Sequence, residues 1–415
     1  MTHLALAGGT RQRGDRTFPD WPIRGAEERA LVDEVVANGP WSFNGPKELE
    51  FNQKFAAFCG AKHGFCVANG TVSIEICLRA AGIKPGDEVI VPSLTWIATA
   101  SAALYAGATV VFSDIDRRTY QLDATRVEEA ITERTRAIIP VHLYGRLADM
   151  DAFREIARRH NLLLIEDCAH GHGGIWNGER TGSMGDFGSF SFQESKVITS
   201  GEGGFITTNS DEYADLVYGV KNCGRIPSPE STRERYVLGS NYRITEMQAA
   251  LLLAQFTRLE DQINRRHRNG LWLDTELATI EGVTPLYRDP RIQRQSYYGY
   301  VVRYDAAAFG GLPVEVFREA LRAEGVPCGA TYGPVWTTRL WGPAPHQTWR
   351  ISSSAAAEAA DGEAVILPQP VLLGSEDDMV DIAAAIRKIQ AHQGELDGIT
   401  VEKPQPASVA RAGGR

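Results

Sequence analysis

The chain has 415 residues, of which 43% are hydrophobic and 23% charged, a composition that supports a large apolar core and excludes disorder over most of its length. Its 43 lysines and arginines against 52 aspartates and glutamates give a formal net charge of −9. Because an acidic chain without a basic block binds nucleic acid and anionic membranes poorly, we expect a small-molecule partner held by a local site.

Residues 1–20 form a polar leader that lacks the cationic start and apolar core of a secretion signal, so a cytoplasmic protein is predicted. The longest charge-free run, 89–113, contains Pro92, Gly107 and six serines or threonines, which indicates strand, loop, helix and strand rather than a membrane span. The six cysteines show neither C-x-x-C spacing nor pairing with histidine at metal-ligand spacing. They predict reduced thiols, with no disulfide and no metal.

Short apolar runs then alternate with helical patterns. The apolar runs predict strands at 88–92, 108–112, 137–142 and 162–166. The patterns between them predict helices at 95–105, 125–131 and 150–160. Continuous apolar strands joined by helices indicate a mainly parallel sheet covered on both faces, and ligands of such sheets bind at the carboxyl ends of the strands.

The pattern changes from about residue 186. Alternating strands are predicted at 188–192 and 204–208, and one long helix at 245–269. A strand at 297–304 and helices at 313–324 and 376–391 follow, the last with Ser375 and Asp378 as a capping box. We therefore predict a large domain at 21–255, a smaller α+β domain at 256–393, and a disordered tail at 394–415, which is rich in Pro, Ala, Gly and charge.

A lysine lies between a predicted strand and a glycine-rich turn, in Ser191-Phe-Gln-Glu-Ser-Lys196 followed by Gly201-Glu-Gly-Gly204. Ser191 and Gln193 are two residues apart, which places their side chains on one face, as in a strand that lines a pocket. The glycines allow backbone and ligand to approach closely. The alternative for Lys196 is an ordinary surface lysine before a turn.

The strand at 162–166 ends in two carboxylates, Glu166 and Asp167. At the carboxyl end of a buried parallel strand, a carboxylate is placed to meet a cationic ring nitrogen or a metal. A metal is the weaker interpretation, because His170 and His172 lie two residues apart in a loop without a third ligand nearby. The ordinary role of an acidic strand end is a cap or a salt bridge.

Two further features suggest a phosphate and a flat ring. Gly70 and Thr71 open a helical pattern, where free backbone amides and the hydroxyls of Thr71 and Ser73 form an anion site, the alternative being a simple N-cap. Trp96 follows a strand and is placed to stack on a planar ligand, although core packing is the commoner use of tryptophan. A phosphorylated aldehyde with a cationic ring that bonds to lysine satisfies all these features, and pyridoxal 5'-phosphate is that molecule.

Eight short motifs follow one another along the chain. They are Trp41–Pro46, Ala68–Thr71, Asp87–Pro92, Val141–Gly145, Glu166–His170, Ser191–Lys196, Gly201–Gly204 and Gly239–Ala249. In this order they resemble the DegT/DnrJ/EryC1/StrS family of pyridoxal-phosphate-dependent sugar aminotransferases, over about residues 21–390. The resemblance implies an α/β fold of the aspartate aminotransferase type (fold type I) and a homodimer with shared active sites.

The resemblance also implies roles for residues around the cofactor. Lys196 would form the Schiff base, Asp167 would pair with the pyridine nitrogen, and Trp96 would stack on the ring. The phosphate would be held by Gly70, Thr71 and Ser191, together with Asn241 of the neighbouring subunit.

Two residues depart from the family pattern. His170 stands where many members have glutamine, and we expect it to contact the cofactor hydroxyl through a different donor. Gln193 stands where many members have histidine, and with Tyr332 it is a candidate for the substrate wall. The alternatives are ordinary packing for Tyr332 and, for Asn241, a turn or a cap on the helix near Thr245.

The motifs Ser-Phe-Gln-x-x-Lys, Ser-Gly-Glu-Gly-Gly and Gly-Ser-Asn are similar to those of scyllo-inosose and 2-deoxy-scyllo-inosose aminotransferases and of 3-amino-5-hydroxybenzoate synthases, which serve antibiotic and other natural-product pathways. The implied reaction moves an amino group from glutamine or glutamate to a ketone on a cyclitol or sugar ring. Lys196 favours transamination, because members that dehydrate sugars carry histidine there. The alternatives are an aromatising dehydratase with the same cofactor and lysine, and a non-catalytic cofactor-binding regulator, which the absence of a helix-turn-helix signal or basic patch disfavours.

Overall fold

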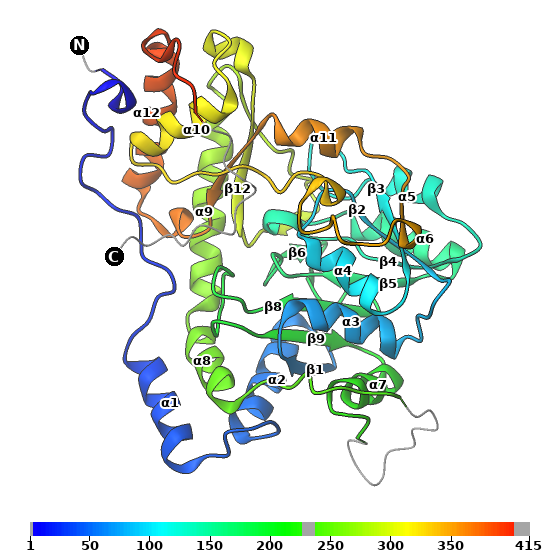
Figure 1. Ribbon diagram of the computed structural model, residues 1–415. Coiled ribbons are helices and arrows are strands. Elements are labelled where there is room, and N and C mark those ends of the chain that lie inside the picture. Colours follow the sequence, from blue (N-terminus) through cyan, green and yellow to red (C-terminus); the bar gives the residue numbers. More distant parts are fainter. Residues whose placement is uncertain (1–2, 226–236, 402–415) are drawn as a thin grey trace.

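The computed structural model describes residues 3–225 and 237–401 (Figure 1). Its largest sheet has eight strands in the order β1-β9-β8-β5-β4-β2-β3-β13. In chain order these strands are β1 (His63–Val67), β2 (Glu88–Pro92), β3 (Thr109–Ser113), β4 (Thr135–Ile138), β5 (Leu163–Asp167), β8 (Phe187–Ser191), β9 (Gly204–Thr208) and β13 (Trp349–Ile351). The six neighbours from β8 to β13 pair in parallel, whereas β9 runs antiparallel to β1 and β8. The mainly parallel sheet is therefore confirmed.

Helices cover both faces of this sheet because its strands are apolar on both sides. In β2, Val89 and Val91 pack in one buried cluster with α3 (Gly70–Ala80), α4 (Ile97–Tyr105) and α7 (Asp211–Lys221), whereas Ile90 packs in another with α5 (Ala124–Ala130) and α6 (Met150–His160). The predicted helices at 95–105, 125–131 and 150–160 are confirmed within two residues at each end. Two N-terminal helices, α1 (Ala26–Asn38) and α2 (Pro46–Cys59), pack against α8 (Glu246–Phe256).

The predicted strand at 137–142 lies earlier, at β4 (Thr135–Ile138). Beyond Ile138 the chain stays extended but changes partner. The Ile139 amide donates to Ile90 in β2, while the Pro140 carbonyl accepts from the Asp167 amide in β5. Because proline has no N–H to donate, the regular ladder stops at this point.

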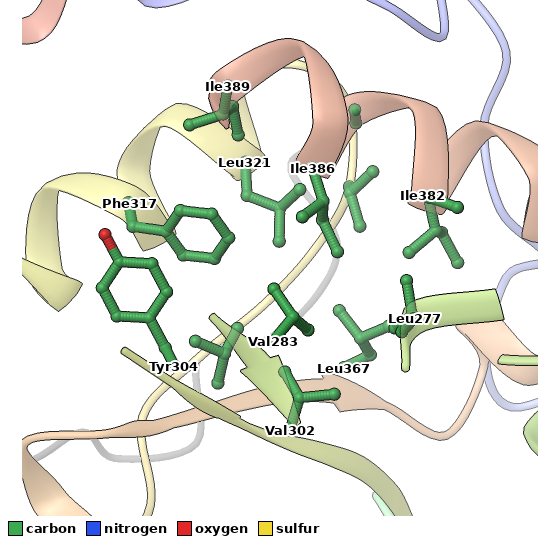
Figure 2. Packing of buried hydrophobic residues seen from close by; sticks show 14 of the residues in the cluster. Leu277, Val283, Val302, Tyr304, Phe317, Leu321, Leu367, Ile382, Ile386 and Ile389 are labelled. Atoms are coloured by element: carbon green, nitrogen blue, oxygen red, sulfur yellow. The ribbon is translucent and has the colours of Figure 1, made fainter. Parts of the chain in front are cut away.

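The C-terminal part forms a smaller α+β unit. Its sheet consists of β10 (Val283–Pro285), β12 (Gly299–Tyr304) and β14 (Ala364–Pro368), covered by α9 (Leu259–Leu277), α10 (Val314–Ala323) and α12 (Glu376–Ala391). Figure 2 shows how Phe317 and Leu321 of α10 meet Ile386 of α12 above the strands. Ser375 caps α12 with Asp378, as predicted.

The remaining elements are short. A second three-stranded sheet joins β11 (Ile292–Arg294), β6 (Ile175–Trp176) and β7 (Glu179–Arg180), and α11 spans Ala355–Asp361. Single 3₁₀ turns lie at Ala5–Ala7, Leu143–Gly145, Ala306–Phe309, Val335–Thr337, His346–Thr348, Val371–Leu373 and Gln393–Leu396. Within the described residues, no helix combines the length and the apolar character needed to cross a membrane.

The single helix predicted at 245–269 is wrong, because the chain forms α8 and α9 with a break between them. Arg258 leaves the helical region at φ −113° and ψ 1°. Its guanidinium donates to the Ile23 carbonyl and to Glu28, and the Thr257 hydroxyl donates back to Ala254. These side-chain bonds tie the break to α1 and interrupt the helical backbone. The division into domains at 21–255 and 256–393 stays a prediction.

Both ends of the described chain pack on the smaller unit. Leu4 and Leu396 are buried in its core, and the buried guanidinium of Arg13 pairs with Asp378 and Asp381 at 2.7 and 3.1 Å. The leader is therefore anchored, and the chain is packed beyond 394, where the tail was expected to begin. Residues 402–415 lie outside the described residues. Composition did not indicate this packing, because Leu4 and Leu396 are buried by helices that lie far away in the sequence.

Candidate active site

Five of the predicted site residues gather at one edge of the large sheet. Gly70 follows β1, Trp96 follows β2, Asp167 ends β5, Ser191 ends β8, and Lys196 lies in the loop after β8. Because β2, β5 and β8 run in parallel, their carboxyl ends meet at this edge, where ligands of α/β sheets bind. The five residues therefore lie at the sheet edge where we expect a ligand to bind.

The start of α3 approaches Ser191 so closely that a glycine is required. A Cβ on Gly70 would lie 2.7 Å from the Ser191 Cβ, and one on Gly204 would lie 2.4 Å from the Asn69 carbonyl. Asn69 caps α3 by accepting a 3.0 Å hydrogen bond from its third residue. The first two amides of α3, those of Gly70 and Thr71, donate to no acceptor among the described residues. These amides and the neighbouring hydroxyls fit a phosphate group.

Asp167 is a buried carboxylate held by neutral donors. Its oxygens accept from the Thr99 hydroxyl at 2.8 Å and from the Ala169 amide at 3.1 Å. Burial raises the pKa of Asp167, and the Thr99 hydrogen bond opposes that rise. Within the described part of the chain, no cationic side chain lies within 4 Å of this carboxylate. A cationic ring nitrogen would supply the missing charge.

Glu166 points to the side of β5 opposite to Asp167, and hydrogen bonds within the fold occupy both of its carboxylate oxygens. Its two oxygens accept from backbone amides in 182–185 at 2.7 to 3.0 Å and from His142 Nε2 at 3.2 Å. With Cys168, these side chains bring three potential metal ligands within 4.8 Å of one another. His142 Nδ1 accepts from the Ala148 amide, so the cluster is accounted for as a hydrogen-bonded core.

Lys196 lies in a compact loop with only 8% of the residue exposed. Its backbone amide donates to Gln193 at 2.9 Å, and the Glu194 amide donates to Gly201 across the loop. The Nζ lies 4.6 Å from the centre of the Tyr298 ring. No carboxylate of the described residues pairs with this amine, which is therefore available to a ligand.

His170 is buried and neutral. Its Nδ1 accepts from the Tyr144 amide at 3.2 Å, which leaves the proton on Nε2. Burial, followed by the charge of Lys196, holds the pKa of His170 well below its usual value. The expected donor to a cofactor hydroxyl is therefore Nε2.

The predicted substrate-wall residues are linked through a residue that was not predicted. Gln193 Oε1 accepts from the hydroxyl of Ser195 at 2.7 Å, and this hydroxyl lies 3.0 Å from that of Tyr298. Tyr298 and Tyr332 pack against the same buried cluster, and the Tyr332 ring lies 5.5 Å from that of Trp96. Trp96 is 36% exposed, as an aromatic that receives a ligand should be.

Asn241 is exposed, and its side chain makes a local contact. Its side chain accepts from the Arg243 amide at 3.4 Å, and its backbone bridges to Asn222. Thr245, rather than Asn241, caps α8 with Gln248. The helix-cap alternative is therefore wrong, whereas the turn alternative matches the Arg243 contact.

Sequence reasoning missed Tyr298, Ser195 and Thr99. Ser195 lies inside the lysine motif, one residue before Lys196, and could have been considered there. Tyr298 lies in a tyrosine-rich run before β12, and Thr99 in an ordinary helix. Neither pattern indicates a site, because each residue meets its partner only in the folded chain.

Comparisons with known proteins agree with this architecture. The profile of the DegT/DnrJ/EryC1/StrS aminotransferase family matches residues 22–387. The chain is 40% identical to an L-glutamine:2-deoxy-scyllo-inosose aminotransferase of Streptoalloteichus tenebrarius, covering 95% of this chain and 99% of that protein. It is 38% identical to a provisionally assigned L-glutamine:3-amino-2,3-dideoxy-scyllo-inosose aminotransferase of Micromonospora echinospora, covering 95% and 98%. The crystal structure of a 3-amino-5-hydroxybenzoic acid synthase superposes with a TM-score of 0.80 at 34% identity, over 89% of this chain and 97% of that one.

Proposed function

The chain belongs to the DegT/DnrJ/EryC1/StrS aminotransferase family, and from this membership we propose a pyridoxal-phosphate-dependent transfer of an amino group from L-glutamine to the ketone of a cyclitol such as 2-deoxy-scyllo-inosose. The fold is that of the aspartate aminotransferase type (fold type I). The observation that carries the proposal is the presence, at one sheet edge, of a Lys196 amine that pairs with no carboxylate of the described residues and a buried Asp167 with no cationic side chain of those residues within 4 Å. The names of the relatives support glutamine over glutamate as donor.

The side chains at this edge fit pyridoxal phosphate. Lys196 would hold its aldehyde carbon, and Asp167 its ring nitrogen. Trp96 would cover the ring, and His170 Nε2 would donate to the ring hydroxyl. The phosphate would be held where the start of α3 approaches the end of β8, by Gly70, Thr71 and Ser191.

When bound, the cofactor supplies an electron sink for a carbanion formed at the carbon that loses a proton. Asp167 would hold a proton on the ring nitrogen, because its carboxylate is buried and no cationic side chain of the described residues lies within 4 Å of it. The Lys196 amine is the group at this edge that is placed to take and return a proton at carbon. Gln193 and Tyr332 are the residues that we propose contact the acceptor ring.

A second candidate is an aromatising dehydratase that uses the same cofactor and lysine. The likeness to 3-amino-5-hydroxybenzoic acid synthase favours it, although that identity is 34% against 40% for the cyclitol aminotransferase. An aminated cyclitol as product supports transamination, and an aromatic product supports the dehydratase.

We also propose a cytoplasmic homodimer in which Asn241 reaches the phosphate site of the partner subunit. The exposure of Asn241, and the assignment of the α8 cap to Thr245, support a role outside its own chain. The free cysteines, four of them buried, fit a reducing compartment.

The deciding experiment incubates the purified protein with pyridoxal phosphate, a panel of ketocyclitols and keto-sugars, and either glutamine or glutamate. We expect amination of 2-deoxy-scyllo-inosose with glutamine, and none with Lys196→Ala. Failure of every ketone to be aminated would overturn the proposal.

A further inference from the structure

We propose that Tyr298 is a positioning residue whose ring face holds the Lys196 amine and whose hydroxyl, through Ser195, turns the amide of Gln193 toward the acceptor. The inference rests on the proposed function, since it gives Lys196 and Gln193 their roles. It goes further by stating which Gln193 atom meets the substrate and what orients the lysine.

The ring of Tyr298 contacts two groups that the proposed function places against the cofactor, His170 and Lys196. It stacks on the His170 imidazole with centroids 3.7 Å apart and planes 11° from parallel. The Lys196 Nζ lies 4.6 Å from its centroid, within the range of a cation–π contact. Because His170 is neutral, the phenol is free to act as the electron-rich surface for the lysine cation.

The hydroxyl of Tyr298 belongs to a directed chain of hydrogen bonds. Gln193 Oε1 accepts from both the amide and the hydroxyl of Ser195, at 2.8 and 2.7 Å. Because a carbonyl oxygen only accepts, the hydroxyl hydrogen of Ser195 is donated to Gln193. The Tyr298 hydroxyl, 3.0 Å away, must then donate to Ser195.

This direction determines how Gln193 faces the ligand. Since both donors of Ser195 require the amide oxygen, the orientation of the Gln193 amide is settled by its partners. Nε2, with its two hydrogens, is left for the substrate. Gln193 therefore donates a hydrogen bond to the substrate. The substrate class is a ring that carries a hydrogen-bond acceptor, such as the hydroxyl oxygen of a polyol, at the position that faces Gln193.

Three variants separate the two roles of Tyr298. Tyr298→Phe keeps the ring and removes the hydroxyl, Tyr298→Leu removes both, and Ser195→Ala breaks the chain at its next member. Ring loss should destabilise the protonated nitrogen of Lys196. In the cofactor-loaded enzyme without substrates, we expect the midpoint of the pH-dependent absorbance to fall by about half to one pH unit in Tyr298→Leu and to stay unchanged in Tyr298→Phe.

The hydroxyl is tested with 2-deoxy-scyllo-inosose. Tyr298→Phe and Ser195→Ala should each raise its KM by about five- to tenfold, the size of one lost hydrogen bond, while the single-turnover rate with glutamine is unchanged. The double variant should be no worse than either single variant, because both break the same chain.

Three results would overturn the proposal. The first is a Tyr298→Leu enzyme that folds and keeps the wild-type midpoint. The second is a double variant whose effects are additive. The third is a Tyr298→Phe enzyme whose glutamine step slows as much as its acceptor step. If Tyr298→Leu does not fold, Tyr298→Met provides the same loss of ring with a more adaptable side chain. A wild-type protein that forms no Lys196 linkage at all would instead refute the proposed function.

Discussion

Replacing Asp167 with asparagine should separate catalysis from stability, because the role that we propose for its charge is toward the bound cofactor. The amide is nearly isosteric and keeps the oxygen that accepts from Ala169. Its nitrogen would face the hydroxyl of Thr99, which is able to accept from it and donate to Thr95 Oγ1, 3.0 Å away. The pocket therefore tolerates the substitution, and the charge alone is lost.

The expected effects on activity and on stability have opposite signs. Removal of one preorganised electrostatic stabiliser costs about 10²- to 10³-fold in kcat, or about 2.7–4 kcal/mol. Burial raises the pKa of Asp167 in the folded chain, so its contribution to stability is present at low pH and is lost as pH rises through that raised pKa. At neutral pH the ionised group weakens the cofactor-free protein, and asparagine should leave it as stable as wild type or more so.

The assay pairs thermal unfolding of the cofactor-free proteins at pH 7 with transamination by the loaded enzymes. Thr99→Val is the matched control, because it removes one hydrogen bond from the carboxylate and keeps its charge, and we expect a loss of about tenfold or less. Activity of Asp167→Asn within threefold of wild type, or clear destabilisation at pH 7, would refute the reasoning. Glu166 offers no substitute, since the fold uses both of its oxygens.

Three more perturbations test the site. Lys196→Ala should lose multiple turnover yet fold and bind pyridoxal phosphate non-covalently, and a persistent Schiff-base absorbance in the variant would contradict the assignment. Gly70→Ala should weaken cofactor binding about tenfold or more, because its Cβ would lie 2.7 Å from that of Ser191. Gly394→Ala is the control, since its Cβ would meet nothing within 4 Å. Equal cofactor affinities of the two variants in a titration would count against the phosphate site. If Asn241→Ala is badly impaired, mixing it with Lys196→Ala should restore activity in heterodimers, because one site then carries both lesions and the other carries none. Verified heterodimers without rescue would rule out a shared site.

Local sequence determined the elements whose signals lie within a few residues. Strands 88–92 and 204–208 and helices 150–160 and 376–391 occur at the predicted residues. Alternation or helical spacing defines their buried faces, and neighbouring side chains such as Ser375 define their ends. The positions of Asp167 and Lys196 were also evident, since each follows a recognisable strand. Their chemical roles stay predictions that the variants above test.

Tertiary structure decided which side chains complete the site. Thr99 reaches Asp167 from 68 residues away, and Tyr298 reaches Ser195 across 103 residues. The same holds for the break between α8 and α9, which Arg258 stabilises through Ile23. A periodic pattern reports only whether a residue faces the core. The partner it meets there depends on how the sheet orders its strands and how the two units pack, and that order is set by the burial of the whole chain.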